Sequence, residues 1–178
     1  MSALQPLSFL KLALAAAMTV LFTASLVEAA EPENALTLKE LMAVVVTDST
    51  NVLWNAALLD PPAGSDKAAP TDAQWQEFRA NALKLQEIPS LLLAQSLLIA
   101  PYGTAATEGS LAPDDIAQLR TGNWPAWQAQ VQVLQSGAQA TLKAIDSKNF
   151  DAMLEAGDSM YPVCESCHQQ FWYPAPAQ

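Results

Sequence analysis

The sequence predicts an all-α protein, folded as an antiparallel four-helix bundle. Beyond residue 30, apolar side chains recur with helical spacing, and no strand-like alternation or hairpin turn dominates any segment. Segments rich in proline and glycine divide this pattern into four pieces. The long connection between the second and third pieces leaves room for antiparallel neighbours throughout the bundle.

The first helix is expected from Thr37 to about Leu59. Thr37 and Glu40 form the capping pattern T-x-x-E, and the stretch Asp60-Pro61-Pro62-Ala63-Gly64 ends the helix. The polar residues 47–51 form a weak point where we expect a bend. The apolar stripe of this helix consists of Leu38, Leu41, Met42, Val45, Val52 and Leu53.

The second helix is expected to begin at Thr71. Pro89 lies within it, and its ring removes a backbone donor and clashes with the preceding turn, so we expect a kink or an early end there. A long connection, residues 100–122, follows, and a short helix opens in it at Pro113. The inward positions of the second helix are Trp75, Phe78, Ala82, Leu85 and Leu92.

The third helix opens at Asn123, and the fourth runs from about Ser147 to Tyr173. The apolar stripe of the fourth helix is nearly unbroken and heptad-like, which predicts that it faces the core. The inward positions are Trp124, Trp127, Val131, Leu134, Ala138, Leu142 and Ile145 in the third helix, and Phe150, Met153, Leu154, Gly157, Tyr161, Cys164, His168 and Phe171 in the fourth.

Both cysteines and the only histidine of the chain lie in five consecutive residues, Cys164-Glu165-Ser166-Cys167-His168. C-x-x-C-H is the attachment motif of a c-type haem, in which two thiols form thioethers with the porphyrin and the imidazole binds the iron. On a helix, Cys164, Cys167 and His168 leave from one face because they stand at i, i+3 and i+4. The sequence therefore predicts one covalent haem c on the fourth helix, inside the bundle.

Two other uses of these residues are less favoured. A redox disulfide of this spacing belongs to a strand–helix junction in an alternating βαβ pattern, which the chain lacks. A structural zinc site needs four ligands, and no further cysteine or histidine is present to complete one.

The N-terminal residues have the pattern of an export signal. An apolar run from Leu12 to Val27 leads to small residues at the positions that a signal peptidase reads. The run is short for a bilayer span of about 20 apolar residues, so we expect cleavage after Ala29, with an uncleaved anchor as the alternative. This prediction divides the chain into a signal peptide, residues 1–29, and a single domain, residues 30–178, that does not insert into a membrane.

The chain is acidic, with a formal net charge of −10. It has no basic patch, which argues against binding to nucleic acid or to anionic lipid surfaces. Electrostatic steering would instead favour a cationic partner, at a rate that falls as salt rises.

A C-terminal C-x-x-C-H on the last of four helices, after an exported leader, resembles the class II c-type cytochromes, which comprise cytochrome c′ and its low-spin, methionine-ligated relatives. The residues that carry the resemblance are Gly157-Asp158, Tyr161, the stretch from Cys164 to Trp172 and, more weakly, Thr37 to Met42. The chain departs from cytochrome c′ itself, because Gln169 and Gln170 follow the histidine where a basic residue is usual. The resemblance implies attachment of haem outside the cytoplasm, hence a periplasmic location, and it allows a homodimer.

The sixth ligand of the iron decides the expected function. Beyond the signal, the methionines are Met42, Met153 and Met160, and the last two share a helix with His168, so they approach from its side. Met42 lies on the first helix, where the family places its distal residue, and we expect it to ligate the iron. Two alternatives stay open: Met42 is an ordinary core methionine, or Lys39 binds after losing its proton. We also expect one or two of the tryptophans to contact the haem.

These expectations favour a periplasmic one-electron carrier with a redox protein as partner, not an enzyme. Ligation by His168 and Met42 would keep the iron six-coordinate in both oxidation states and raise its potential. The alternative is a five-coordinate haem protein, as in cytochrome c′, that binds nitric oxide or carbon monoxide. Peroxidase-like chemistry ranks last, because it needs a distal acid–base group and the chain has no second histidine.

Overall fold

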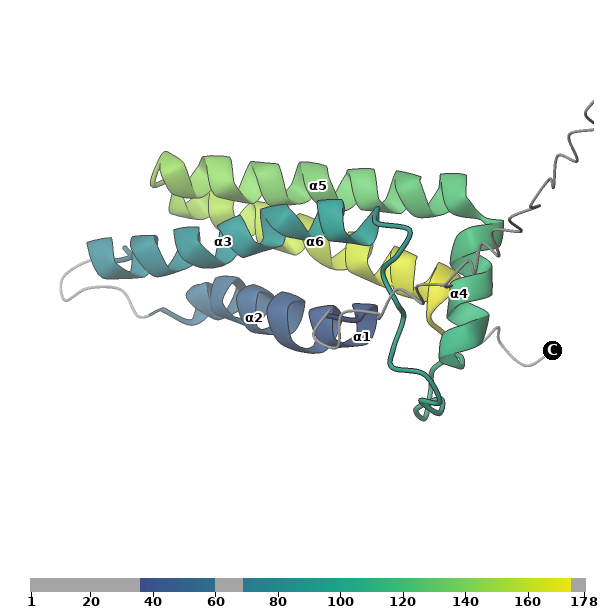
Figure 1. Cartoon of the computed structure of the whole chain (residues 1–178). Helices are drawn as coiled ribbons and strands as arrows, with labels where there is room; N and C mark the ends of the chain where they lie inside the picture. Colours follow the sequence, from purple (N-terminus) through teal and green to yellow (C-terminus); the bar gives the residue numbers. More distant parts are fainter. Residues whose placement is uncertain (1–35, 60–68, 174–178) are drawn as a thin grey trace, which may run out of the picture. The chain divides into compact units, whose positions relative to one another are not determined.

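The computed structural model describes residues 36–59 and 69–173. Within these ranges the regular structure is helical and contains no strand, so the predicted all-α class is confirmed (Figure 1). The described residues all belong to one compact unit, Asn34–Gln178. The expected signal peptide, residues 1–29, and the expected helix stop, residues 60–64, lie outside the described residues.

The first helical segment runs from Leu38 to Leu58 in four consecutive pieces. Its start is as predicted: the Thr37 backbone N–H donates to Glu40 Oε2 over 2.8 Å, and the Glu40 backbone N–H donates to Thr37 Oγ1 over 3.3 Å. The pieces are α1 (Leu38–Glu40), a π-helix (Leu41–Val46), α2 (Thr47–Asn55) and a 3₁₀ turn (Ala56–Leu58).

The irregular part of this segment differs from the expected one. The polar residues 47–51, where a bend was predicted, belong to the regular helix α2, and the π-helix Leu41–Val46 directly precedes them. The backbone N–H of Thr47 donates to the Met42 carbonyl, an i→i−5 bond that widens the turn. The Thr47 hydroxyl donates to the same carbonyl over 2.8 Å. Thr47 therefore closes the wide turn. The bend prediction was wrong, because the irregular part of the helix lies about one turn before residues 47–51.

Helix α3 (Asp72–Leu92) begins at Thr71, which forms a capping box with Gln74. Pro89 is buried inside the helix, and α3 continues for three residues beyond it. The predicted early end is therefore not seen. The inward positions predicted for α3 are all buried: Trp75, Phe78, Ala82, Leu85 and Leu92.

Three helices follow: α4 (Pro113–Gly122), α5 (Trp124–Asp146) and α6 (Phe150–Phe171). The short helix at Pro113 and the start after Asn123 are as predicted, whereas α6 begins after Asn149 instead of at Ser147. The Asn149 side chain caps α6 by accepting from the Ala152 backbone N–H over 3.0 Å. Helix α6 runs through Pro162 without a break.

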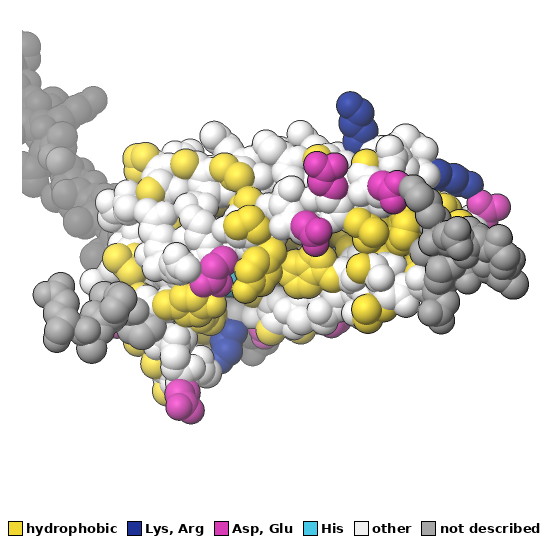
Figure 2. Space-filling view, turned by 180° about the vertical axis from the view of Figure 1, so that it is seen from behind, with side chains coloured by type: hydrophobic (Ala, Val, Ile, Leu, Met, Phe, Trp, Pro, Cys, Tyr) yellow, Lys and Arg dark blue, Asp and Glu magenta, His cyan; other side chains and the backbone are white. Residues whose placement is uncertain are grey.

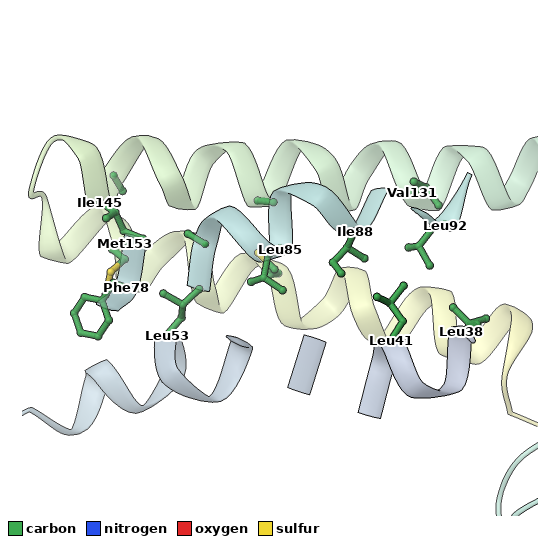
Figure 3. Close-up of a cluster of buried hydrophobic side chains, with 14 of the residues drawn as sticks. Leu38, Leu41, Leu53, Phe78, Leu85, Ile88, Leu92, Val131, Ile145 and Met153 are labelled. Atoms are coloured by element: carbon green, nitrogen blue, oxygen red, sulfur yellow. The ribbon is translucent and has the colours of Figure 1, made fainter. Parts of the chain in front are cut away.

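Helix α5 packs along both α6 and α3, and α2 packs on α3 and reaches α6 (Figure 1). Helix α4 lies across the end of α5 (Figure 1). Buried apolar side chains from the first helical segment, α3, α5 and α6 meet between the helices (Figure 3). They include Leu38, Leu41, Leu53, Phe78, Leu85, Ile88, Leu92, Val131, Ile145 and Met153.

At one position of α6, the residue that faces the core differs from the predicted one. Tyr161 is 62% exposed, whereas the neighbouring Met160 is 3% exposed. Met160 packs against α5, where a Cβ added to Gly137 would lie 2.9 Å from its Cγ. The glycine therefore makes the space that draws Met160 inward and leaves Tyr161 outside.

Of the described residues, the stretch Leu38–Leu58 is long and apolar enough to cross a membrane, judged by length and composition alone. The core helix of a soluble protein passes the same test, so this is weak evidence about location.

Candidate functional site

A cavity of about 470 Å³ lies between the first helical segment and α6, with α5 and the end of α3 completing its wall. All four predicted site residues line it: Met42, Cys164, Cys167 and His168. Figure 2 shows hydrophobic side chains gathered in a band on one face of the molecule, with acidic side chains beside the band. The other lining residues are Lys39, Ala43, Val46, Thr47, Thr50, Asn51, Trp54, Leu92, Gln130, Val131, Leu134, Val163, Trp172 and Tyr173.

The wall formed by α6 carries the C-x-x-C-H motif. Cys164, Cys167 and His168 lie in continuous helix and line the same cavity, as the i, i+3, i+4 spacing predicts. All three side chains are half-buried, and both cysteines are free thiols. These three side chains were predicted to face the core and are half-buried at the cavity wall, whereas the buried residues of α6 are Met153, Met160 and Phe171.

A second wall is formed by the first helical segment, and Met42 lies on it within the π-helix. Lys39, the second candidate for the distal position, lines the same cavity. Met153 and Met160 do not line it, since they are 2% and 3% exposed in the core beneath α6. Among the methionines of the described residues, Met42 is thus the one that shares the cavity with His168.

Aromatic side chains occupy two parts of the cavity wall. Trp54 donates its indole N–H to the Gly157 carbonyl over 3.4 Å, and its ring meets Tyr161 edge-on at a centroid distance of 6.4 Å. Beyond the end of α6, the rings of Trp172 and Tyr173 lie 6.3 Å and 6.0 Å from the His168 ring.

Sequence reasoning left open which tryptophans would reach the site, and Trp54 and Trp172 do so. It also missed Val46 and Thr50 as lining residues. A usable signal is present, because Met42, Val46, Thr50 and Trp54 recur at intervals of four residues along the first helical segment.

Burial favours the uncharged forms of the two cysteine thiols and of the His168 imidazole. Burial raises the pKa of the Cys164 thiol, and burial together with the neighbouring Cys164 raises the pKa of Cys167 to about 11. Burial also lowers the pKa of His168, although nearby Glu165 opposes this shift. The shift favours the neutral imidazole, which is the form that binds a metal ion.

Comparison of the chain with protein-family models, with curated protein sequences and with solved structures finds no match.

The donor set, the volume and the apolar lining of the cavity fit a haem. Its volume lies within the range of about 300–1,000 Å³ that is usual for ligand and cofactor sites. Most of the lining is apolar, as a porphyrin face requires, while two thiols and an imidazole stand on one wall and a thioether on the other. No Asp or Glu is among the described residues that line it.

Proposed function

We propose that this chain is a periplasmic c-type cytochrome of the class II kind that carries single electrons. In this proposal the first helical segment, α3, α5 and α6 form an antiparallel four-helix bundle around one haem c. The packing of α5 on α3 and α6, and of α2 on α3, supports this arrangement. Export by the N-terminal leader belongs to the same proposal.

Each residue of the motif has a separate task. Cys164 and Cys167 hold the haem by two thioethers, and His168 binds the iron from the wall of α6. Haem iron supplies reversible one-electron redox chemistry. The apolar lining residues exclude water from the site, which together with a thioether ligand raises the reduction potential.

The observation that carries the proposal is that Met42 and His168 line one cavity and come from two different elements, the π-helix and α6. A methionine and a histidine on opposite sides are the ligand pair of electron-carrying c-type cytochromes. A filled sixth position also favours a carrier over gas binding. The absence of carboxylates among the described lining residues favours a carrier over a peroxidase, which needs a distal acid–base group.

Optical and electron paramagnetic resonance spectra of the haem-loaded protein test this proposal. We expect a low-spin ferric spectrum with a methionine–iron charge-transfer band that Met42→Ala abolishes. Met153→Leu is the matched control, since it alters a buried methionine outside the cavity and should leave the band unchanged. A high-spin spectrum that shifts on adding carbon monoxide would contradict ligation by Met42 and favour the five-coordinate, gas-binding alternative.

A further inference from the structure

Three carboxylates form a row on the outer side of α6, beside the cavity. Glu155 and Asp158 are exposed and Glu165 is half-buried, and their spacing of three and seven residues places them on one helical face. We call Glu155, Asp158 and Glu165 the acidic row.

Little positive charge offsets the acidic row. The 22 residues of α6 contain no lysine or arginine. Within the described part of the chain, the two ion pairs join Arg79 to Asp146 and Lys148 to Asp72, so neither neutralises the row. Glu165 accepts hydrogen bonds from Gln169 over 2.9 Å and from Tyr173 over 3.5 Å, and both donors are neutral groups.

The acidic row shares α6 with an exposed tyrosine, Tyr161, whose ring contacts Trp54 of the cavity wall. Tyr161 is 62% exposed and Trp54, which lines the cavity, is 37% exposed. Trp54 contacts α6 at the Gly157 carbonyl, directly before Asp158 in the chain. A partner that covers the Trp54–Tyr161 pair therefore also meets the acidic row. Aromatic residues are enriched at protein–protein interfaces, and the rim around them is polar.

We propose that the acidic row and the Trp54–Tyr161 pair form the electron-exchange surface, and that its partner is a redox protein with a basic docking face. This inference rests on the proposed function and adds to it the place of docking. A second copy of the chain is a poor occupant, because it would bring two acidic rows together. Opposite charges would instead speed the encounter and give it a strong dependence on salt.

The test compares two charge-matched triple variants of the haem-loaded protein. The first neutralises the row by Glu155→Gln, Asp158→Asn and Glu165→Gln. The control, Glu77→Gln, Glu87→Gln and Asp115→Asn, removes the same charge from exposed positions on α3 and α4 that do not line the cavity. The reduced protein gives one electron either to the cation tris(phenanthroline)cobalt(III), which becomes cobalt(II), or to the anion ferricyanide, which becomes ferrocyanide.

At low ionic strength we expect the row variant to react about fivefold more slowly with the cobalt cation and faster with ferricyanide. The control variant should change both rates much less, and at about 0.5 M salt the differences should vanish. An equal slowing in both variants would overturn the inference, since it would reflect net charge alone.

A binding measurement gives a second, independent readout. In a nuclear magnetic resonance titration with a decalysine peptide, the α6 amides and the Trp54 indole N–H should shift in the unaltered protein and in the control variant, but not in the row variant. Shifts centred on α3 or α4 would overturn the inference. A chain that takes up no haem would refute the proposed function, whereas the peptide titration still reports on the acidic row.

Discussion

Thr47 donates two hydrogen bonds to the carbonyl oxygen of Met42, one from its backbone N–H and one from its hydroxyl over 2.8 Å. A carbonyl in a regular helix accepts from the residue four positions later, whereas here the donor is five positions later. The residue proposed as distal ligand is thus held in a wide turn that a polar neighbour closes. π-Bulges of this kind often occur at functional sites.

Replacing Thr47 by valine should weaken this turn. Loss of one hydroxyl hydrogen bond is expected to lower the free energy of unfolding by about 1 kcal/mol and to reduce the low-spin fraction of the haem-loaded protein. Urea unfolding and spin-state spectra measure the two effects. Thr121→Val is the control, because it removes a similar bond, from the Thr121 hydroxyl to the Ala117 carbonyl over 2.7 Å, in α4. If both variants kept the wild-type spectrum, the turn would have no part in presenting Met42.

Removing the thiols should abolish the covalent attachment of haem without preventing the chain from folding. Each of Cys164→Ala and Cys167→Ala leaves one thioether, and the double variant leaves none, so acidic organic solvent should extract its haem. Both side chains are half-buried at the cavity wall and outside the tightly packed core, so helix content should stay near the wild-type value. Solvent extraction and circular dichroism provide the two measurements. Haem that resisted extraction from the double variant would contradict attachment at the motif.

The thiols should make the stability of the haem-free chain depend on pH in the alkaline range. Folding raises the pKa of Cys167 from its ordinary value of 9.0 to about 11 and also raises that of Cys164. A raised pKa means that the folded state keeps its protons longer, so this contribution is full below pH 9 and is lost as pH rises through 11. Urea unfolding between these limits should show a steeper loss for the wild type than for Cys164→Ser/Cys167→Ser. Parallel curves would show that the thiols do not titrate with a raised pKa.

Two helical glycines provide a matched pair for testing the packing of α6. A Cβ on Gly137 would lie 2.9 Å from Met160 Cγ, whereas a Cβ on Gly157 would lie 3.5 Å from Trp54 Cδ1, an ordinary contact. Both changes to alanine gain similar helix propensity. Gly137→Ala should therefore be less stable than Gly157→Ala by about 1–3 kcal/mol, the usual cost of overpacking. Thermal unfolding measures the difference, and equal stabilities would mean that Met160 moves aside freely.

Much of the fold could be predicted because local chemistry specifies it. Thr37 and Thr71 start helices through capping boxes, and Pro113 opens a short helix, as their side chains dictate. The choice between Met160 and Tyr161 was wrong, because the two positions flank the apolar stripe of α6 on either side and the decision lies with Gly137 on another helix. Such a tertiary contact leaves no trace in the periodicity of α6.

The candidate site was predicted from chemistry as well as from pattern. The cavity brings Met42, Cys164, Cys167 and His168 together, as expected. Trp54 and Tyr173 were not assigned to the site, because their placement depends on the crossing of the first segment with α6 and on the chain beyond Phe171. The identity of the distal ligand and the haem itself stay predictions.

The π-helix also has a bearing on how this segment tolerates changes in length. Side chains on a regular helix advance by about 100° per residue, so positions four apart drift by about 40° with each turn. Met42, Val46, Thr50 and Trp54 nevertheless border one cavity, and the wide turn takes up part of that drift. Deleting a single residue between Leu41 and Val46 would restore regular winding and leave Met42 and Trp54 eleven positions apart, about 20° from three full turns, so Trp54 would stay on the side on which Met42 lies. The wide turn thus absorbs one residue locally, and the helix beyond it keeps its phase.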